Sequence, residues 1–150
     1  MRRYTLEDER NSHSEFGAVK DEEYLLRVIY APEHIKDGLV IEASISLDDL
    51  NLKGFSLDRE MYADSSLVQQ RISIQTERSP DKRQSSSISK FRCSDAREIL
   101  DQANERAFIV IDDAIVENKA HASLYSAKEG LGKGTLRKLR SLLLPLLQQN

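Results

Sequence analysis

A short run of apolar residues in the last third of the chain places the strongest constraint on the fold. Residues 108–111 are apolar on every side, and the run stops at two carboxylates, Asp112 and Asp113. Four such residues in a row are too few for a buried helix and are typical of a central strand that is covered on both faces. A second apolar segment opens at His121, so the sequence predicts two neighbouring strands joined by a polar loop.

Three further stretches are rich in β-branched, aromatic or alternating apolar residues, and each predicts a strand. They cover residues 24–30, 39–46 and 88–93. Residues 55–59 also alternate, which fits a short strand or an extended loop. Pro80 and a run of serines interrupt residues 77–87, and this predicts an exposed loop there.

The helical signals are of unequal strength. Asp64 or Ser65 fits the N-cap of a helix that reaches Thr76, although residues 71–75 alternate as a strand does. Ser94 fits the N-cap of a helix whose apolar side chains recur at helical spacing as far as residue 103.

A last helix is predicted over residues 135–147, with its leucines on one broad stripe. Together these elements predict an α+β fold: a single domain with a mostly antiparallel sheet of about five strands, two or three helices and this C-terminal amphipathic helix. The folded domain is expected to span residues 24–150. Residues 1–23 are mostly charged or small and polar, and this predicts a flexible charged arm.

The composition narrows the class of protein. The chain has 150 residues and a formal net charge of −3, which argues against nucleic acid as a partner. Its single cysteine, Cys93, cannot form an internal disulfide, so a reducing cytoplasmic location is expected. The longest apolar run lies near the C-terminus, is interrupted by Pro145 and is too short to span a bilayer, so no membrane association is expected.

Motifs for a metal or a cofactor are lacking. The glycines around Lys133 precede a predicted helix, but Gly134 separates Lys133 from Thr135, so the spacing of a phosphate-binding P-loop is not met. A flexible hinge explains this segment better. Neither a metal site nor a cofactor is therefore predicted.

Polar residues at the ends of the predicted strands form one group of candidate site residues. His121 could act as a general acid or base, Arg59 could bind an anion, and His34 or Asp112 could support them. Asp112 and Asn118 could instead form a binding site, or simply face water in a turn. A shared pocket for Arg59 and His121 would define a small metal-independent hydrolase or nuclease acting on a phosphate-bearing substrate.

The C-terminal helix provides a second candidate surface. Four basic side chains lie opposite its leucine stripe: Lys133, Arg137, Lys138 and Arg140. A basic amphipathic helix can dock on a partner protein or on a second copy of the chain, although a leucine stripe is more often part of a protein's own core.

Three segments together resemble a pattern found in small bacterial proteins that have no established activity. They are Asp37-Gly38, the run from Gly54 to Arg59, and Ile111-Asp112-Asp113 followed by Asn118 and His121-Ala122. The family usually has proline after the asparagine, where this chain has Lys119. The resemblance implies a cytosolic bacterial protein and transfers no catalytic residue.

The leading hypothesis from the sequence is a small intracellular bacterial protein that acts through protein–protein contact, as an accessory or regulatory partner or as a homodimer. The hydrolase with a His/Arg site is the alternative, so enzymatic activity remains an open question at this point.

Overall fold

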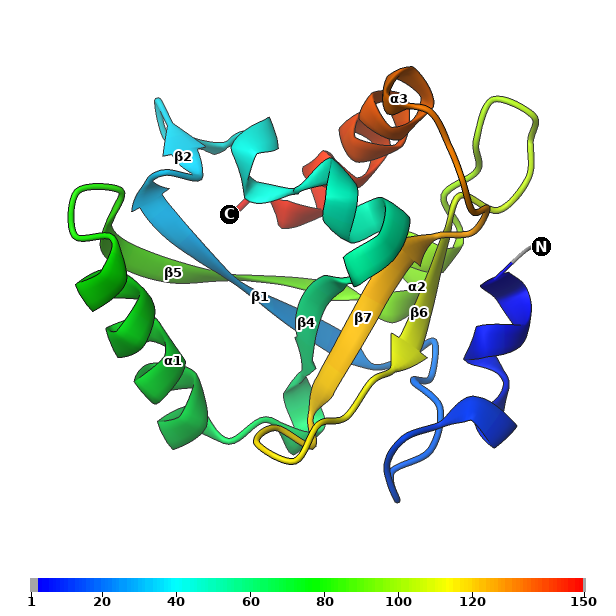
Figure 1. Ribbon diagram of the computed structural model, residues 1–150, viewed down its shortest axis with the longest axis horizontal. Coiled ribbons are helices and arrows are strands. Elements are labelled where there is room, and N and C mark those ends of the chain that lie inside the picture. The colour runs from blue at the N-terminus through cyan, green and yellow to red at the C-terminus, as the bar shows by residue number, and fades with distance from the viewer. Residues whose placement is uncertain (1–2, 150) are drawn as a thin grey trace.

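The computed structural model describes residues 3–149 and shows a mixed α+β domain built on one antiparallel sheet of five strands (Figure 1). The strand order is β5-β1-β4-β7-β6. These strands are β1 (Tyr24–Pro32), β4 (Phe55–Arg59), β5 (Arg83–Arg92), β6 (Phe108–Asp112) and β7 (His121–Ser126). A separate two-stranded sheet pairs β2 (Ile35–Lys36) with β3 (Leu39–Val40). The predicted fold class is confirmed.

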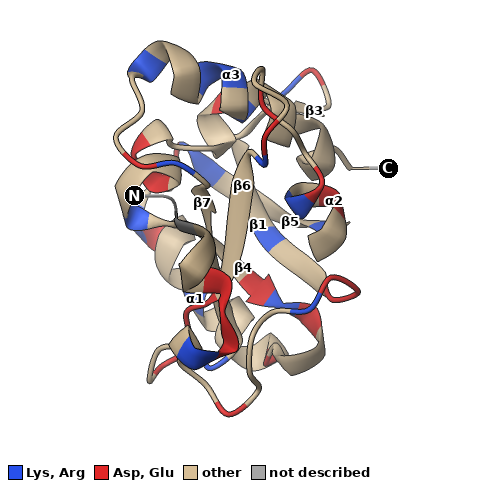
Figure 2. Cartoon of the chain, turned by 90° about the vertical axis from the view of Figure 1, so that its right-hand side faces the viewer, with Lys and Arg blue, Asp and Glu red and all other residues tan. Residues whose placement is uncertain are grey.

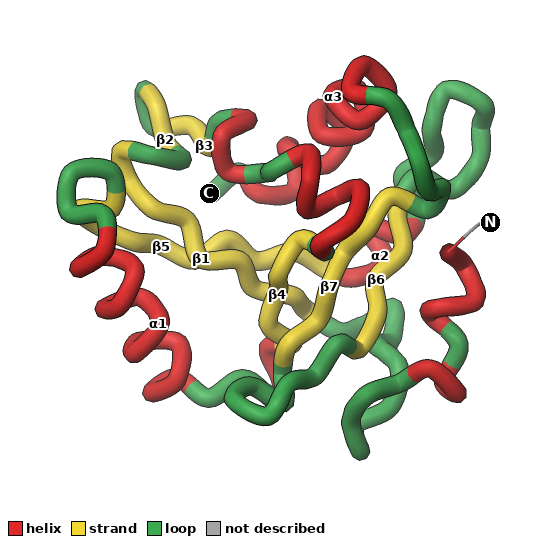
Figure 3. Tube along the Cα trace, viewed as in Figure 1, coloured by secondary structure: helices red, strands yellow, loops and turns green. Residues whose placement is uncertain are grey.

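Three α-helices and several short helical turns surround the sheet (Figure 3). The helices are α1 (Ser65–Arg78), α2 (Cys93–Arg97) and α3 (Lys133–Leu143). The short turns are η1 (Arg3–Glu7), η2 (Glu9–Asn11), η3 (Glu42–Ser44), η4 (Asp49–Lys53), η5 (Glu60–Tyr62) and η6 (Leu144–Leu147). The predicted C-terminal helix is thus α3 followed by η6. Residues 1, 2 and 150, which belong to the predicted arm and domain, lie outside the described residues.

Several predicted boundaries differ from the structure for local reasons. The strand expected over residues 39–46 ends at Val40, because the Ser44 hydroxyl donates to the Ile41 carbonyl and closes η3. Strand β5 begins at Arg83 inside the predicted loop, because its serines lie on an exposed sheet edge where small polar side chains are tolerated. Helix α2 ends at Arg97, well before residue 103. The segment 71–75, which was ambiguous in the sequence, is helical. Its helix begins after Asp64, whose side chain caps it by accepting hydrogen bonds from the Ser66 and Leu67 amides.

One face of the sheet forms the main core. Alternate residues of every strand point to it, and α3 and η6 contribute buried leucines from above. The buried leucines of these two elements are Leu136, Leu139, Leu143 and Leu147. The opposite face carries α1 on one side, next to β5. Strand β6 was predicted to be central but lies at an edge of the sheet, and it is nevertheless fully buried.

The burial of β6 depends on the N-terminal segment. Glu7 accepts a hydrogen bond from the Val110 amide at 3.1 Å and pairs with Arg97 Nε at 2.7 Å, while Arg97 donates to the Val110 carbonyl. The outward amide and carbonyl of Val110 are therefore both satisfied. Further along, one carboxylate oxygen of Asp112 accepts hydrogen bonds from the hydroxyls of Ser12 and Ser14. Burial acts to raise the pKa of Asp112, but these bonds outweigh it, and the pKa lies below its ordinary value.

A buried arginine, Arg59, also holds the N-terminal segment against the sheet. Arg59 has no exposed surface, and its guanidinium bonds both carboxylate oxygens of Glu23, at 2.8 and 2.7 Å. It also donates to the Gly17 carbonyl at 2.8 Å, and Asp112 lies 3.8 Å from its Nη1 atom. Residues 17–23 thus provide the groups that compensate a fully desolvated charge on the sheet.

Strands β1 and β4 separate after a short stretch of pairing, and this separation positions the candidate site. The register pairs Leu25 with Arg59 and Leu26 with Asp58, and it ends there. In a continued ladder the Ser56 carbonyl would face Val28. It accepts instead from Nη1 of Arg27, at 2.9 Å. The side of β1 beyond Leu26 is therefore unpaired by any described strand and faces a cavity.

The first prediction concerns the contribution of the Arg59–Glu23 pair to stability. Substitution Glu23→Gln leaves the Arg59 charge buried with reduced compensation, so we expect the free energy of unfolding to fall by about 3 kcal/mol. Urea denaturation monitored by circular dichroism measures this change. Asp8→Asn is the control, since the Asp8–Arg10 pair is exposed and exposed pairs contribute little. Equal stability of the two variants would contradict the role given to Arg59.

Candidate functional site

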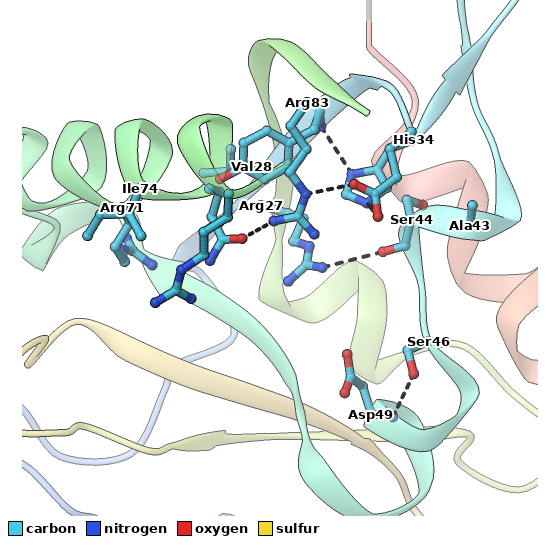
Figure 4. Close-up of a pocket in the computed structure, with 14 residues that line it drawn as sticks. Arg27, Val28, His34, Ala43, Ser44, Ser46, Asp49, Arg71, Ile74 and Arg83 are labelled. Atoms are coloured by element: carbon cyan, nitrogen blue, oxygen red, sulfur yellow. Dashed lines mark hydrogen bonds and ion pairs between the residues drawn. The ribbon is translucent and has the colours of Figure 1, made fainter. Parts of the chain in front are cut away.

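A cavity of about 560 Å³ lies where β1 leaves β4, between α1 and the segment 43–49 (Figure 4). Its wall is made by separate parts of the chain: β1 and the turn after it, η3 and the residues that follow, the second half of α1, and the first residue of β5. The volume is within the range of small-molecule sites. Four arginines line it: Arg27, Arg71, Arg78 and Arg83.

The cavity is positive although the chain as a whole is negative. Against its four guanidinium groups stand only two carboxylates, Glu33 and Asp49. Glu33 is engaged by Arg83, whose Nε atom lies 2.7 Å from a Glu33 oxygen, and this hydrogen bond lowers the pKa of Glu33. Burial raises the pKa of Asp49. Arg71 is paired with Asp58, which lies outside the wall, and Asp49 acts on Arg27 from beyond ion-pair distance, so an excess of positive charge remains on the wall.

Arg27 forms no ion pair with a carboxylate anywhere in residues 3–149. Its guanidinium donates to the Ser56 carbonyl at 2.9 Å and to the Ser44 carbonyl at 3.4 Å, and it lies over the Phe55 ring. Its Nε atom is buried and has no hydrogen-bond partner in the protein. Burial lowers the pKa of Arg27, but a guanidinium remains charged at neutral pH. Such a group is costly unless an anion compensates it.

Arg71 reaches the cavity from α1, and only some of its hydrogen-bond donors have partners. Its Nη2 atom lies 2.8 Å from Asp58 Oδ2, while its Nε atom is buried without a partner. Asp58 is held in turn by the side-chain amide of Asn118, at 2.7 Å. Asn118 therefore acts through Asp58 to position Arg71. Two arginines from different elements thus line one cavity, and each has a buried Nε atom without a partner in the protein.

His34 lines the cavity but is not available as a base. Its Nδ1 atom accepts a hydrogen bond from the Tyr30 amide at 3.1 Å, so the proton of the neutral ring is on Nε2, which lies 3.7 Å from a Glu33 oxygen. Burial lowers the pKa of His34 to about 4. The ring is therefore neutral at pH 7, and its basic nitrogen is already used.

The structure does not bring Arg59 and His121 together, and the shared pocket considered from the sequence is a wrong prediction. His121 is directly opposite Asp58 in the register of β4 and β7. Arg59 is the next residue of β4, and consecutive strand residues point to opposite faces of the sheet. Arg59 is committed to Glu23, and the His121 ring donates from Nδ1 to the Asp113 carbonyl at 2.8 Å. His34 lies apart from both, in the arginine-lined cavity.

The two predicted binding residues of the β6–β7 region have internal partners. Asp112 points to the same face as Arg59 and binds the N-terminal segment, whereas Asn118 binds Asp58 on the other face. They do not form a common site. Of the two, only Asn118 is connected to the cavity, through Asp58 and Arg71.

The basic residues of the C-terminal helix remain at the surface, as Figure 2 shows along α3. Lys133, Arg137 and Lys138 are exposed, and Arg140 is half-buried with an ion pair to Glu42 at 3.2 Å. The leucines of the opposite stripe are buried in the main core. The helix therefore offers a charged surface and no continuous apolar one.

The only cysteine is a core residue. Cys93 is fully buried, and burial raises the pKa of its thiol to about 12. A thiol of this kind is a poor nucleophile at neutral pH. Within residues 3–149, no group of three or more His, Cys, Asp or Glu side chains is arranged to hold a metal ion. None of the helices in this range has the length and apolar character needed to cross a bilayer.

Comparison with known proteins gives no match to a family model, to a curated protein or to a solved structure. This is consistent with the resemblance noted from the sequence, which carries no established activity. The cavity is therefore interpreted from its own geometry.

The arginines of the cavity were not among the residues singled out from the sequence. Arg27 interrupts the apolar pattern of a predicted strand, and a lone charge at such a position was the one local signal available. Arg71, Arg78 and Arg83 lie far from it in the chain and meet it only through the packing of α1 against β5.

The state of His34 leads to the second prediction, which concerns pH. A folded-state pKa near 4 lies below the ordinary value of 6.5, so the unfolded chain binds more protons between these values. We therefore expect stability to fall as the pH is lowered from about 6.5 to about 4. His34→Asn retains an acceptor for the Tyr30 amide and should weaken this dependence, as measured by urea denaturation at several pH values. A normal pKa for His34 in an NMR titration would contradict the assignment.

Proposed function

We propose that the protein binds a small phosphate-bearing molecule in the cavity between α1 and β1. The observation that carries this proposal is the convergence of four arginines from three elements on one cavity, whose wall has only two carboxylates. Guanidinium groups bind phosphate oxygens through several hydrogen bonds at once. A phosphate group in the cavity would compensate the excess positive charge of its wall.

The shape of the cavity favours a phosphate that is attached to a larger organic group. Its volume exceeds the needs of a free phosphate ion, and Val28, Tyr30 and Ile74 contribute apolar surface to its wall. Arg78 is exposed at the end of α1, and Arg83 lies over the Tyr30 ring. A phosphate monoester with a sugar or a ring would contact both the charged and the apolar parts.

Binding is favoured over catalysis because the groups that could react are already engaged. The Ser44 hydroxyl donates to the Ile41 carbonyl, and the Ser46 hydroxyl accepts from the Asp49 amide. The Nδ1 atom of His34 accepts from the Tyr30 amide. A nucleophile needs a base within hydrogen-bond reach, and among the described residues of this wall no hydrogen bond joins a hydroxyl to a carboxylate or to an imidazole.

The third prediction tests the ligand class by isothermal titration calorimetry. We expect AMP to bind more tightly than inorganic phosphate, because the organic group adds apolar contact. Arg27→Lys keeps the charge but removes the fork, and loss of a charged hydrogen bond should weaken AMP binding about tenfold to a hundredfold. Arg78→Met should weaken binding less, because this side chain lies at the exposed end of the site.

Arg137→Lys on α3 is the matched control for Arg27→Lys, since it changes an exposed arginine outside the cavity. Its AMP affinity should equal that of the wild type. If the wild type binds neither probe, or if the control loses as much affinity as Arg27→Lys, the proposal is wrong. Circular dichroism of each variant shows whether the fold is retained.

A further inference from the structure

The outer edge of β5 differs from the rest of the sheet boundary, because its backbone groups are left open. Strand β5 is the last strand in the sheet order and pairs with β1 alone. The amide and carbonyl of Tyr30 both bond His34, so they point away from β5. The register partner of Tyr30 is Ser86, whose own amide and carbonyl must then point outward. Because the direction of the backbone groups alternates along a strand, the amides and carbonyls of Ile88 and Lys90 also point outward.

The devices that usually protect a sheet edge do not occur along residues 85–92 of this one. Natural edges are guarded by outward lysines, prolines, bulges or a covering segment. Lys90 instead lies across the sheet face, with its Nζ atom 2.9 Å from Glu60 and over the Tyr24 ring. Residues 85–92 contain no proline, and the one irregularity of the β1–β5 register is a bulge at Gln84, which is skipped between the pairs Ala31–Ser85 and Pro32–Arg83.

The other end of the sheet shows the contrast. There Glu7 and Arg97 bind the outward amide and carbonyl of Val110, which closes the β6 edge. On β5, the side chains of residues 84–86 and Ile88 are exposed, so no described segment covers them.

We propose that this edge pairs with the β5 edge of a second copy of the chain, antiparallel and about a two-fold axis at Ile88. A two-fold interface brings the same surface of both copies together, and an antiparallel edge is self-complementary in hydrogen bonding. The backbone amides and carbonyls of the outward residues then form hydrogen bonds between the copies. Ser86 pairs with Lys90 of the second copy, Ile88 with its own equivalent, and Lys90 with Ser86. The inference is independent of the ligand proposed for the cavity.

The charges of the strand decide the position of the axis. Every charged residue of β5 is basic: Arg83, Lys90 and Arg92. An axis at Lys90 would set two lysines opposite each other, and an axis at Ser86 would set Lys90 opposite Lys82; like charges in direct opposition destabilise a sheet. An axis at Ile88 instead places the uncharged Ser86 opposite Lys90 and leaves Arg92 beside the bulge at Gln84.

The same axis uses the exposed apolar side chain of the strand. Ile88 is 44% exposed and lies near the middle of β5. Pairing about it brings the two copies of this side chain into contact on one face of the joined sheet. Residues 85–91 of each chain would then be paired along their whole length.

Size-exclusion chromatography with light scattering tests the fourth prediction on the full chain. We expect the wild type to have twice the mass of one chain. Ile88→Glu would place two carboxylates opposite each other and should give a single-chain mass. Ser86→Glu is the matched control: its carboxylate would face Lys90 of the second copy, so the doubled mass should remain.

A cysteine cross-link tests the register itself. Hydrogen-bonded antiparallel residues have Cα atoms about 5.5 Å apart, which suits a disulfide. Ile88→Cys should therefore link two chains quickly under mild oxidation, whereas Gln84→Cys should not, and the buried Cys93 does not compete. A single-chain mass for the wild type at all concentrations, or equal cross-linking of the two cysteine variants, would overturn the proposal.

Discussion

The separation of β1 from β4 is the constraint on which the functional features of this structure depend. Antiparallel strands gain stability from a continuous ladder, yet here pairing ends after Leu26 and Asp58. The Arg27 guanidinium takes the Ser56 carbonyl that the ladder would use, and the sheet therefore remains open beside α1. The opening exposes a positive cavity in an acidic chain. An arginine in the middle of a strand thus has both a structural and an electrostatic effect.

The two buried arginines of the sheet are compensated in different ways. Arg59 is surrounded by Glu23, by backbone carbonyls and by Asp112, so its charge is accounted for inside the protein. Arg27 has carbonyl partners but forms no ion pair among the described residues, and Asp49 acts on it only from a longer distance. Because a desolvated charge without a counter-charge is unfavourable, the difference separates an arginine that supports the fold from one that is suited to a ligand.

The sequence could predict those features that depend on local patterns. The apolar run before Asp112 and the Asp64 cap gave a strand and a helix at their observed positions. Features that depend on contacts between distant residues could not be read in the same way. The composition of residues 1–23 predicts a flexible arm, but the partners of Glu7 and Glu23 lie on α2, β6 and β4. The pairing of Asp58 with His121, which separates His121 from Arg59, is likewise fixed only by the β4–β7 register. The cavity arginines come from three elements, and no local motif marks them.

The closed β6 edge has a consequence for assembly. A sheet with two open edges can add further copies at both ends and grow into a fibre of unlimited length. Here the N-terminal segment satisfies the outward groups of Val110, so only the β5 side can accept another strand. Pairing of two chains along β5 would occupy the open backbone groups of this edge in both chains. Assembly would then end at a ten-stranded sheet, because the N-terminal segments of the two chains would cover the β6 edges at its two ends.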